Sequence, residues 1–410
     1  MTQETDVHVA RHPIFDTSLN VFGYELLFRN SVLTNAYSAT DDDQATLATI
    51  TNSFLSIGLE TLTHGKRAFI NFTANALRNN LPAILPVNLI AVEILENVLP
   101  TDEIIAACQA LKKNNYLLVL DDFSFRTELL PLIELADIIK VDFRATPSGE
   151  RHQLISRLKC YPVKFLAEKV ETHEEFQEAL REGYSYFQGY FFCRPLILSG
   201  KTLPGYKMNY LHILQQLHKP EIEISQIEAI VKQDVSLSYD LLKYINSSVF
   251  GLRDKVRSLR QALTLLGQKE LIKWLSLISL KSVNKGKPGE LIVSSLIRAQ
   301  FAESLALRTT LKNREDDAFL MGMLSHIDAL LNLPLAKALD EIGINEEIRR
   351  ALLNETNSPL SELYRLIRAY EEGNWKDFST HAAILQLDDH QILTAHRQAL
   401  IWVNTLLMVA

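Results

Sequence analysis

Residues 116–122 read YLLVLDD, an apolar run that ends in two adjacent aspartates. An uninterrupted apolar run of this length is typical of a β-strand covered on both faces, as in parallel sheets. The two carboxylates then fall at the carboxyl end of the strand. The same pattern recurs before it in LIAVEI (89–94) and after it in IIKVDF (138–143). These stretches predict an α/β fold in which buried strands alternate with helices.

Further strands and helices are predicted throughout residues 1–195. Five more runs rich in β-branched and aromatic residues predict strands: VHVARHPIF (7–15), FGYELLFR (22–29), RAFINF (67–72), VKFLAEK (163–169) and YSYFQGYFF (184–192). Amphipathic stretches of helical length lie between the runs, at residues 42–62, 101–115 and 172–183. Thr101 and Thr172 precede acidic residues and are expected N-caps. Eight strands in fewer than 200 residues predict a compact (β/α) barrel, with an open doubly wound sheet as the alternative.

Polar residues at the carboxyl ends of these strands favour the barrel. They are Glu25, Asn71, Glu93, Asp121, Asp122, Lys140, Glu168 and Gln188. In a barrel those ends converge on one face, where barrel enzymes place their active sites, whereas an open sheet would spread them along an edge.

The chemistry of this set points to divalent cations. Several carboxylates within a few ångströms of one another cannot all stay ionised unless cations neutralise them. Carboxylate and amide oxygens are hard ligands that suit Mg²⁺, Mn²⁺ or Ca²⁺, and no His or Cys accompanies them as a zinc site would require. A pair of such ions clamps the attacking and leaving oxygens of a phosphodiester displacement. In that reaction Lys140 would hold a water or a developing negative charge, and Glu168 would be the general base.

Composition limits the partners and the compartment. Lys and Arg total 42 against 49 acidic residues, a formal charge of −7 that repels the backbone of duplex nucleic acid. Three scattered cysteines suit a reducing compartment rather than a disulfide framework. The N-terminal residues have an acidic start and no apolar core, and no uncharged run reaches the length of a membrane span. A cytoplasmic protein with no membrane partner is expected.

The second half of the chain has a different pattern. Residues 194–205 (RPLILSGKTLPG) hold turn residues without helical periodicity and predict a connection between domains. Beyond it strand signals stop and consecutive amphipathic helices follow. With no repeat of fixed period, an irregular bundle is favoured over an α-solenoid. The predicted organisation is a barrel over residues 1–199 and an all-helical domain over residues 200–410.

Residues 22–195 resemble an EAL domain, a barrel family that hydrolyses cyclic di-GMP to the linear dinucleotide with two Mg²⁺ or Mn²⁺ ions. The resemblance rests on the order and spacing of YELLFR (24–29), FINFT (69–73), VEILE (92–96), LDDF (120–123), IKVD (139–142), AEKVET (167–172) and FQGYFF (187–192). It implies that the metal ligands are Glu25, Asn71, Glu93, Asp121 and Asp122.

The same resemblance implies roles for the other polar residues. Lys140 matches the catalytic lysine, Glu168 matches the proposed base, and Arg29 would contact a phosphate of the dinucleotide. Three residues match positions that support a metal ligand or hold the site and its loop: Gln188, Glu96 and Glu171.

Two departures from the family pattern bear on activity. After LDDF the family has a Gly-rich, Ser-containing loop that orders the metals and reaches a dimer partner, whereas residues 124–130 read SFRTELL. A loop that needs a positive φ there would be strained by Ser124 and Phe125, so a different loop conformation is expected. Lys169 replaces a small residue of the AEGVE-like motif. A homodimer of the family type remains one expected assembly.

Residues from about 206 to 400 resemble an HDOD domain, an all-helical module related to HD phosphohydrolases but without their metal site. The matching stretches are residues 231–277, with Asn246, Ser247, Gly251 and Gly267 in place, and residues 318–330 (AFLMGMLSHIDAL). Ser325 and His326 take the positions of the adjacent His and Asp of HD enzymes. On one helix His326 and Asp328 would lie about 200° apart and could not chelate one metal. The resemblance implies a domain that binds protein partners rather than a second enzyme.

Two main hypotheses follow for function. The first is a bacterial signalling protein with a cyclic di-GMP phosphodiesterase barrel, coupled to an HDOD interaction domain. The second is a non-catalytic EAL-HDOD adaptor, whose barrel binds the nucleotide or only a protein partner. Hydrolysis of a different phosphodiester is a third possibility, because the altered loop changes what the mouth of the barrel admits.

Overall fold

The structure is a computed structural model that describes residues 7–30, 58–193, 227, 241, 244–245, 256, 258–283, 288–342 and 344–409. The chain divides into two compact units. The first contains Met1–Arg194 and Arg368–Asp377, and the second contains Pro195–Ile367 and Phe378–Ala410. The predicted boundary at residues 199 and 200 lies outside the described residues and stays a prediction.

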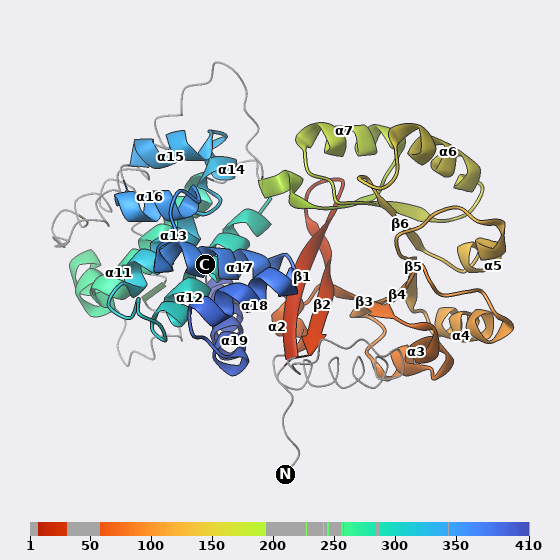
Figure 1. Ribbon diagram of the computed structural model, residues 1–410, viewed down its shortest axis with the longest axis horizontal. Helices are drawn as coiled ribbons and strands as arrows, with labels where there is room; N and C mark the ends of the chain where they lie inside the picture. Colours follow the sequence, from red (N-terminus) through yellow and green to blue (C-terminus); the bar gives the residue numbers. More distant parts are fainter. Residues whose placement is uncertain are drawn as a thin grey trace, which may run out of the picture. The chain divides into compact units, whose positions relative to one another are not determined.

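The first unit is built on a closed barrel whose eight strands neighbour one another in sequence order (Figure 1). The strands are β1 (Val7–Asp16), β2 (Val21–Asn30), β3 (Arg67–Phe72), β4 (Ile90–Ile94), β5 (Leu117–Leu120), β6 (Ile138–Asp142), β7 (Lys164–Glu168) and β8 (Tyr186–Gln188). The predicted barrel is confirmed, and the alternative of an open doubly wound sheet is wrong.

Strand β1 runs antiparallel to both of its neighbours, β2 and β8, whereas the pairs from β2 to β8 are parallel. The cause is the short connection between β1 and β2, because parallel strands need a crossover of a dozen or more residues. Asp16 shapes this turn: its Oδ1 accepts hydrogen bonds from the backbone N–H groups of Ser18 (2.8 Å) and Asn20 (2.9 Å). The first two strands therefore form a hairpin.

One layer of side chains fills the barrel. Its buried members come from seven strands: Ile14, Phe69, Ala91, Val119, Ile138, Leu166 and Tyr186. On β2 the backbone passes close to Phe69, since a Cβ on Gly23 would lie 2.7 Å from Phe69 Cε2. Side chains alternate along a strand, so the residue two positions after each member faces the same way, nearer the carboxyl end in the parallel strands. In each of the parallel strands β3 to β8, that rule places one polar residue on top of the apolar layer.

Short helices follow the strands and lie outside the barrel (Figure 1). They are α2 (Leu59–Thr63), α3 (Ala74–Arg78), α4 (Asp102–Lys113), α5 (Leu130–Ile133), α6 (Ser148–Leu158) and α7 (His173–Glu182), with 3-10 turns at Leu81–Ile84, Thr127–Leu129 and Tyr190–Cys193. The predicted N-caps are confirmed: Thr101 accepts from Ile104 N at 3.5 Å, and Thr172 forms a capping box with Glu175. Most of the helix predicted over residues 42–62 lies outside the described residues.

The segment Arg368–Asp377 packs on β1 within the first unit. The Tyr370 hydroxyl accepts a hydrogen bond from the backbone N–H of Val9 at 3.3 Å. His12 Nε2 donates to the carbonyl oxygen of Glu371 at 2.9 Å. The fully buried ring of His8 contacts the rings of Tyr370 and Trp375. Residues more than 350 positions apart in the sequence thus share one packed interface.

The regular elements that the structure describes in the second unit are all helices. Its helices are α11 (Leu259–Val283), α12 (Glu290–Ala306), α13 (Glu315–Leu324), α14 (Ile327–Leu331), α15 (Leu335–Ile342), α16 (Glu346–Leu352), α17 (Pro359–Glu371), α18 (Trp375–Ile384) and α19 (Asp389–Val409), although the ends of α17 and α18 fall in the first unit. Helices α12 and α13 approach closely at Gly322, where an added Cβ would lie 2.5 Å from Ala299 N. Among the described helices, none combines the length and apolarity that crossing a membrane requires.

Candidate functional site

The polar residues predicted at the strand ends form one cluster with Lys140 at its centre. Lys140 is fully buried on β6. Its Nζ lies within ion-pair distance of four carboxylate oxygens: Asp121 Oδ1 (2.7 Å), Glu168 Oε1 (2.8 Å), Glu93 Oε1 (2.9 Å) and Glu25 Oε1 (3.2 Å). These side chains come from β2, β4, β7 and the residue after β5. The barrel therefore brings together five residues that span 144 positions of the sequence.

Burial and mutual charge shift the pKa values within this cluster. Burial raises the pKa of Glu93 well above its usual range and that of Glu168 to about 8, although Lys140 acts in the opposite direction on both. Burial also opposes ionisation of Glu25, but Lys140 and the hydrogen-bond partners of Glu25 outweigh it and lower its pKa to about 2. For Lys140, burial disfavours the ammonium, and the surrounding carboxylates more than compensate, so its pKa is raised.

The ammonium of Lys140 does not satisfy this cluster on its own. A lysine has three N–H donors, and four carboxylates surround this one. Oε2 of Glu93 and Oδ1 of Asn71 are buried without a hydrogen-bond donor among the described residues, and Glu93 Oε1 has only the Lys140 ammonium at 2.9 Å. Asn71 and Glu93 are paired neighbours on β3 and β4. Because buried oxygens without partners are costly, this set of hard ligands fits a divalent cation.

A second group of oxygens lies at the outer edge of the cluster. Asp121, Asp122 and Glu168 offer ligand oxygens that all lie within 4.8 Å of one another. Asp122 is exposed and has a φ of 39°, a left-handed conformation that turns the chain sharply after β5. The backbone on either side is tied to neighbouring strands, because Asp121 N donates to Ile94 O and Phe123 N donates to Lys140 O. This outer group also fits a divalent cation.

The remaining site residues predicted from sequence lie at different distances from the cluster. Gln188 contacts it directly, because its Nε2 donates to Glu25 Oε2 at 2.7 Å. Glu171 forms an ion pair with Arg144 at the exits of β6 and β7. Glu96 is exposed and lines a pocket beside Asp121 and Asp122. Arg29 lies on β2 opposite His8, but its side chain is outside the described part of the chain.

The SFRTELL loop forms part of the wall of that pocket. Ser124, Arg126 and Leu129 line it with Glu96, and Arg126 Nη2 donates to the backbone oxygen of Glu96 at 3.2 Å. Neither Ser124 nor Phe125 has a positive φ, so neither carries the strain that a glycine-rich loop conformation would impose on it. The turn occurs earlier, at Asp122.

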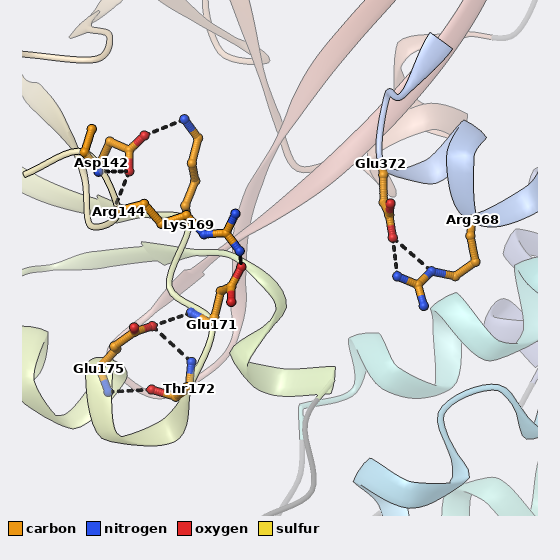
Figure 2. Close-up of polar contacts among 9 residues, drawn as sticks. Asp142, Arg144, Lys169, Glu171, Thr172, Glu175, Arg368 and Glu372 are labelled. Carbon is orange, nitrogen blue, oxygen red and sulfur yellow. Dashed lines mark hydrogen bonds and ion pairs between the residues drawn. The ribbon is translucent and has the colours of Figure 1, made fainter. Parts of the chain in front are cut away.

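Sequence reasoning missed Asp142, the last residue of β6. Its Oδ1 accepts hydrogen bonds from the backbone N–H groups of Arg144 (2.7 Å) and Ala145 (3.0 Å), and its Oδ2 lies 2.5 Å from Lys169 Nζ. Figure 2 shows this pair beside the pair of Arg144 and Glu171. The signal was available, since Asp142 is a carboxylate that ends a predicted strand.

In the helical unit, the residues at the positions of an HD pair do not share one helix. Ser325 is the C-cap of α13 and His326 is the N-cap of α14, so the break between the two helices falls between these residues. His326 directly precedes the helix that contains Asp328, and the expectation that these two side chains do not chelate one metal stays a prediction. Ser325 Oγ accepts from Arg298 Nη1 at 3.0 Å and donates to the carbonyl oxygen of Gly322 at 2.7 Å. These contacts stabilise the junction between α13 and α14.

Family models match both halves of the chain. Residues 15–195 match the EAL domain, and residues 203–361 match the HDOD domain. Among solved structures, the chain resembles the Klebsiella pneumoniae protein BlrP1 in a calcium and cyclic di-GMP complex, at 22% identity over 46% of this chain and 56% of that chain, with a TM-score of 0.38. It also resembles Bacillus subtilis YkuI, in complex with cyclic di-GMP and calcium, at 19% identity over 66% of this chain and 73% of that chain, with a TM-score of 0.39.

Two curated proteins are similar over nearly their whole length. Protein YuxH of Bacillus subtilis is 38% identical over 409 residues, which are 98% of this chain and 99% of the relative. The cyclic di-GMP phosphodiesterase CdgJ of Vibrio cholerae is 35% identical over 383 residues, or 93% of this chain and 88% of the relative. The chain therefore belongs to the EAL-HDOD family, in which an EAL domain is followed by an HDOD domain.

Proposed function

We propose that this protein acts in cyclic di-GMP signalling and that its barrel hydrolyses cyclic di-GMP to the linear dinucleotide. The observation that carries the proposal is the cluster in which one buried ammonium lies among four carboxylates while buried oxygens of Asn71 and Glu93 lack donors. Such an arrangement is costly without a cationic ligand, because buried charge needs a partner. A relative that is 35% identical over 93% of this chain is the cyclic di-GMP phosphodiesterase CdgJ.

In this proposal the oxygens of Glu25, Asn71, Glu93, Asp121 and Asp122 hold two divalent ions, Mg²⁺ or Mn²⁺. When bound, the ions would supply positive charge that orients the phosphate and makes water a better nucleophile. Glu168 accepts the proton of the attacking water, Lys140 stabilises negative charge beside it, and Arg29 binds a phosphate of the dinucleotide. The water oxygen bonds to phosphorus as one P–O bond of the cyclic dinucleotide breaks, and the departing oxygen takes up a proton.

Gln188, Glu96 and Glu171 support this site without contacting the substrate. Gln188 donates to Glu25 and so fixes which of its oxygens faces Lys140. Glu171 pairs with Arg144, and Glu175 Oε2 accepts from the backbone N–H of Glu171 at 2.6 Å, which holds the β7 exit against α7. The helical unit is proposed to bind a protein partner. A homodimer and a cytoplasmic location remain predictions, which light scattering and cell fractionation would test.

The test combines binding and turnover on the full chain. Cyclic di-GMP is titrated calorimetrically with Ca²⁺ present, and product is then followed with Mg²⁺ or Mn²⁺. We expect binding and turnover in the wild type, no turnover in Glu25→Gln, and unchanged turnover in Glu134→Gln, which removes the same charge at an exposed position after α5. Turnover that survives in Glu25→Gln would refute the assignment of the site.

A second function is supported by SFRTELL and Lys169, which depart from the family pattern. In this alternative the barrel is a receptor or an adaptor without turnover. Binding of cyclic di-GMP without product would favour a receptor, and neither heat nor product would favour an adaptor that acts through protein partners. Hydrolysis of another phosphodiester would appear as product from a different cyclic dinucleotide in the same assay.

A further inference from the structure

Lys169 places a cation at the exit of β7, next in sequence to Glu168 of the outer group. It follows Glu168, the last residue of β7, and has a φ of 55°. A left-handed conformation is unfavourable for an ordinary L residue, and glycine or asparagine would adopt it more easily. The strained position is thus occupied by a long cationic side chain, half of which is exposed. Contacts of this side chain must offset the strain.

Two ion pairs hold the side chain of Lys169 and the chain around it in place (Figure 2). Lys169 Nζ lies 2.5 Å from Asp142 Oδ2, and Asp142 is itself fixed by two backbone N–H groups of the following turn. Two residues after Asp142 and two residues after Lys169, Arg144 forms an ion pair with Glu171. The exits of β6 and β7 are therefore joined twice, and the Lys169 ammonium is held at the mouth of the barrel.

The charge of Lys169 acts on the outer group. Its ammonium pairs with Asp142, and Asp142 is the register partner of Glu168 on the neighbouring strand. Partial burial of the Asp122 carboxyl and the nearby Asp121 raise the pKa of Asp122, and the Lys169 ammonium acts in the opposite direction. Asp122 and Glu168 are two of the three residues whose oxygens lie within 4.8 Å of one another. A fixed positive charge there partly neutralises the oxygens and repels any other cation that approaches them.

We infer that Lys169 is a resident cation that weakens the binding of a divalent ion at Asp121 and Asp122, beside Glu168 in the outer group. The protein then binds one divalent ion tightly, at the buried oxygens around Asn71 and Glu93, and a second ion weakly. This inference rests on the proposed function, because it assumes that the cluster holds divalent ions. Lys169 is a positioning residue for charge and not a catalytic residue.

The test measures metal binding without any turnover. Mn²⁺ alone is titrated into the full chain at low ionic strength, and free Mn²⁺ is followed by electron paramagnetic resonance. Lys169→Asn removes the charge and keeps a residue that tolerates positive φ. Lys169→Arg keeps the charge. Lys164→Gln removes a charge at the opposite end of the same strand, roughly 13 Å away for four residues of β-strand.

The wild type is expected to bind two Mn²⁺ ions with unequal affinity. By Coulomb's law, a unit charge at roughly 8 Å from a divalent ion, with water between them, changes the affinity for that ion by about fivefold. Lys169→Asn should therefore tighten the weaker site about fivefold and leave the tighter site unchanged, while Lys169→Arg and Lys164→Gln stay within about twofold of wild type.

The outcomes separate this inference from the function on which it rests. The role of Lys169 would be overturned if Lys169→Asn and the wild type had equal Mn²⁺ dissociation constants at the weaker site, or if Lys164→Gln tightened that site as much as Lys169→Asn does. Either result would leave the assignment of the metal cluster intact. A wild type that binds no Mn²⁺, or whose binding is unchanged in Glu93→Gln, would overturn both the inference and the proposed function.

Discussion

Replacing Lys140 with methionine tests the cluster in its metal-free form. The substitution keeps much of the side-chain volume and removes the single charge that faces Glu25, Glu93, Asp121 and Glu168. Breaking a buried ion pair by removing one partner costs about 3–5 kcal/mol, because the remaining charges stay buried without compensation. Burial already raises the pKa of Glu168 to about 8, so proton uptake by that carboxyl keeps the loss near the lower end of this range.

The expected loss of stability is measurable as a lower thermal unfolding temperature. For a unit of about 200 residues, 1 kcal/mol corresponds to about 2–4 °C in Tm, so Lys140→Met should lower the Tm in EDTA by about 6–12 °C. Lys112→Met is the matched control, because Lys112 forms a 2.5 Å pair with Asp137 with both side chains partly exposed. An exposed pair contributes about 0–1 kcal/mol, so this control should shift the Tm by less than about 4 °C.

Metal addition supplies the second half of this test. Mn²⁺ should raise the Tm of Lys140→Met more than that of the wild type, because a bound cation replaces the missing charge among the carboxylates. The assay is differential scanning calorimetry of full-length protein in EDTA and in Mn²⁺. If Lys140→Met and Lys112→Met have the same Tm in EDTA, the account of Lys140 as the neutralising charge of the cluster is wrong.

Two further changes test the site and the helical unit. Gln188→Leu removes the 2.7 Å hydrogen bond to Glu25, and we expect turnover of cyclic di-GMP to fall about 10- to 100-fold, the usual cost of losing a group that orients a metal ligand; turnover within twofold of wild type would exclude the orienting role. Gly322→Ala forces a Cβ to within 2.5 Å of Ala299 N, so urea unfolding should show a loss of about 1–3 kcal/mol. Gly149→Ala in α6, where nothing lies within 4 Å, should be neutral or stabilising, and equal effects of the two alanines would contradict the packing argument.

Much of the barrel could be predicted from the sequence because its strands are short, apolar and end in polar residues. The same alternation that marks a strand also places the side chain two positions beyond each core residue on the inner face. Phe69 and Asn71 show this on β3, and Leu166 and Glu168 show it on β7. The cluster was therefore predictable as a set of residues at one end of a barrel.

Other features depend on contacts that local pattern does not encode. The hairpin of β1 and β2 results from a short turn shaped by Asp16, which a strand signal alone does not reveal. The break between α13 and α14 separates His326 from the preceding helix although the sequence there is continuously helical in pattern. The pair of Lys169 and Asp142 joins two strand exits, and only the register of β6 and β7 places them together.

The late segment that packs on β1 affects how the two halves can be studied apart. A fragment that stops near residue 199 would lack Tyr370 and Trp375, and would leave the ring of His8 and the N–H of Val9 without these contacts. Since His12, which donates to Glu371, is paired with Glu25 across the hairpin, such a truncation would disturb the neighbour of a site residue. Lower activity of an isolated barrel would therefore show that part of the barrel unit is missing, and would not show that a regulatory domain has been lost. A fragment meant to represent the barrel unit must include residues 368–377.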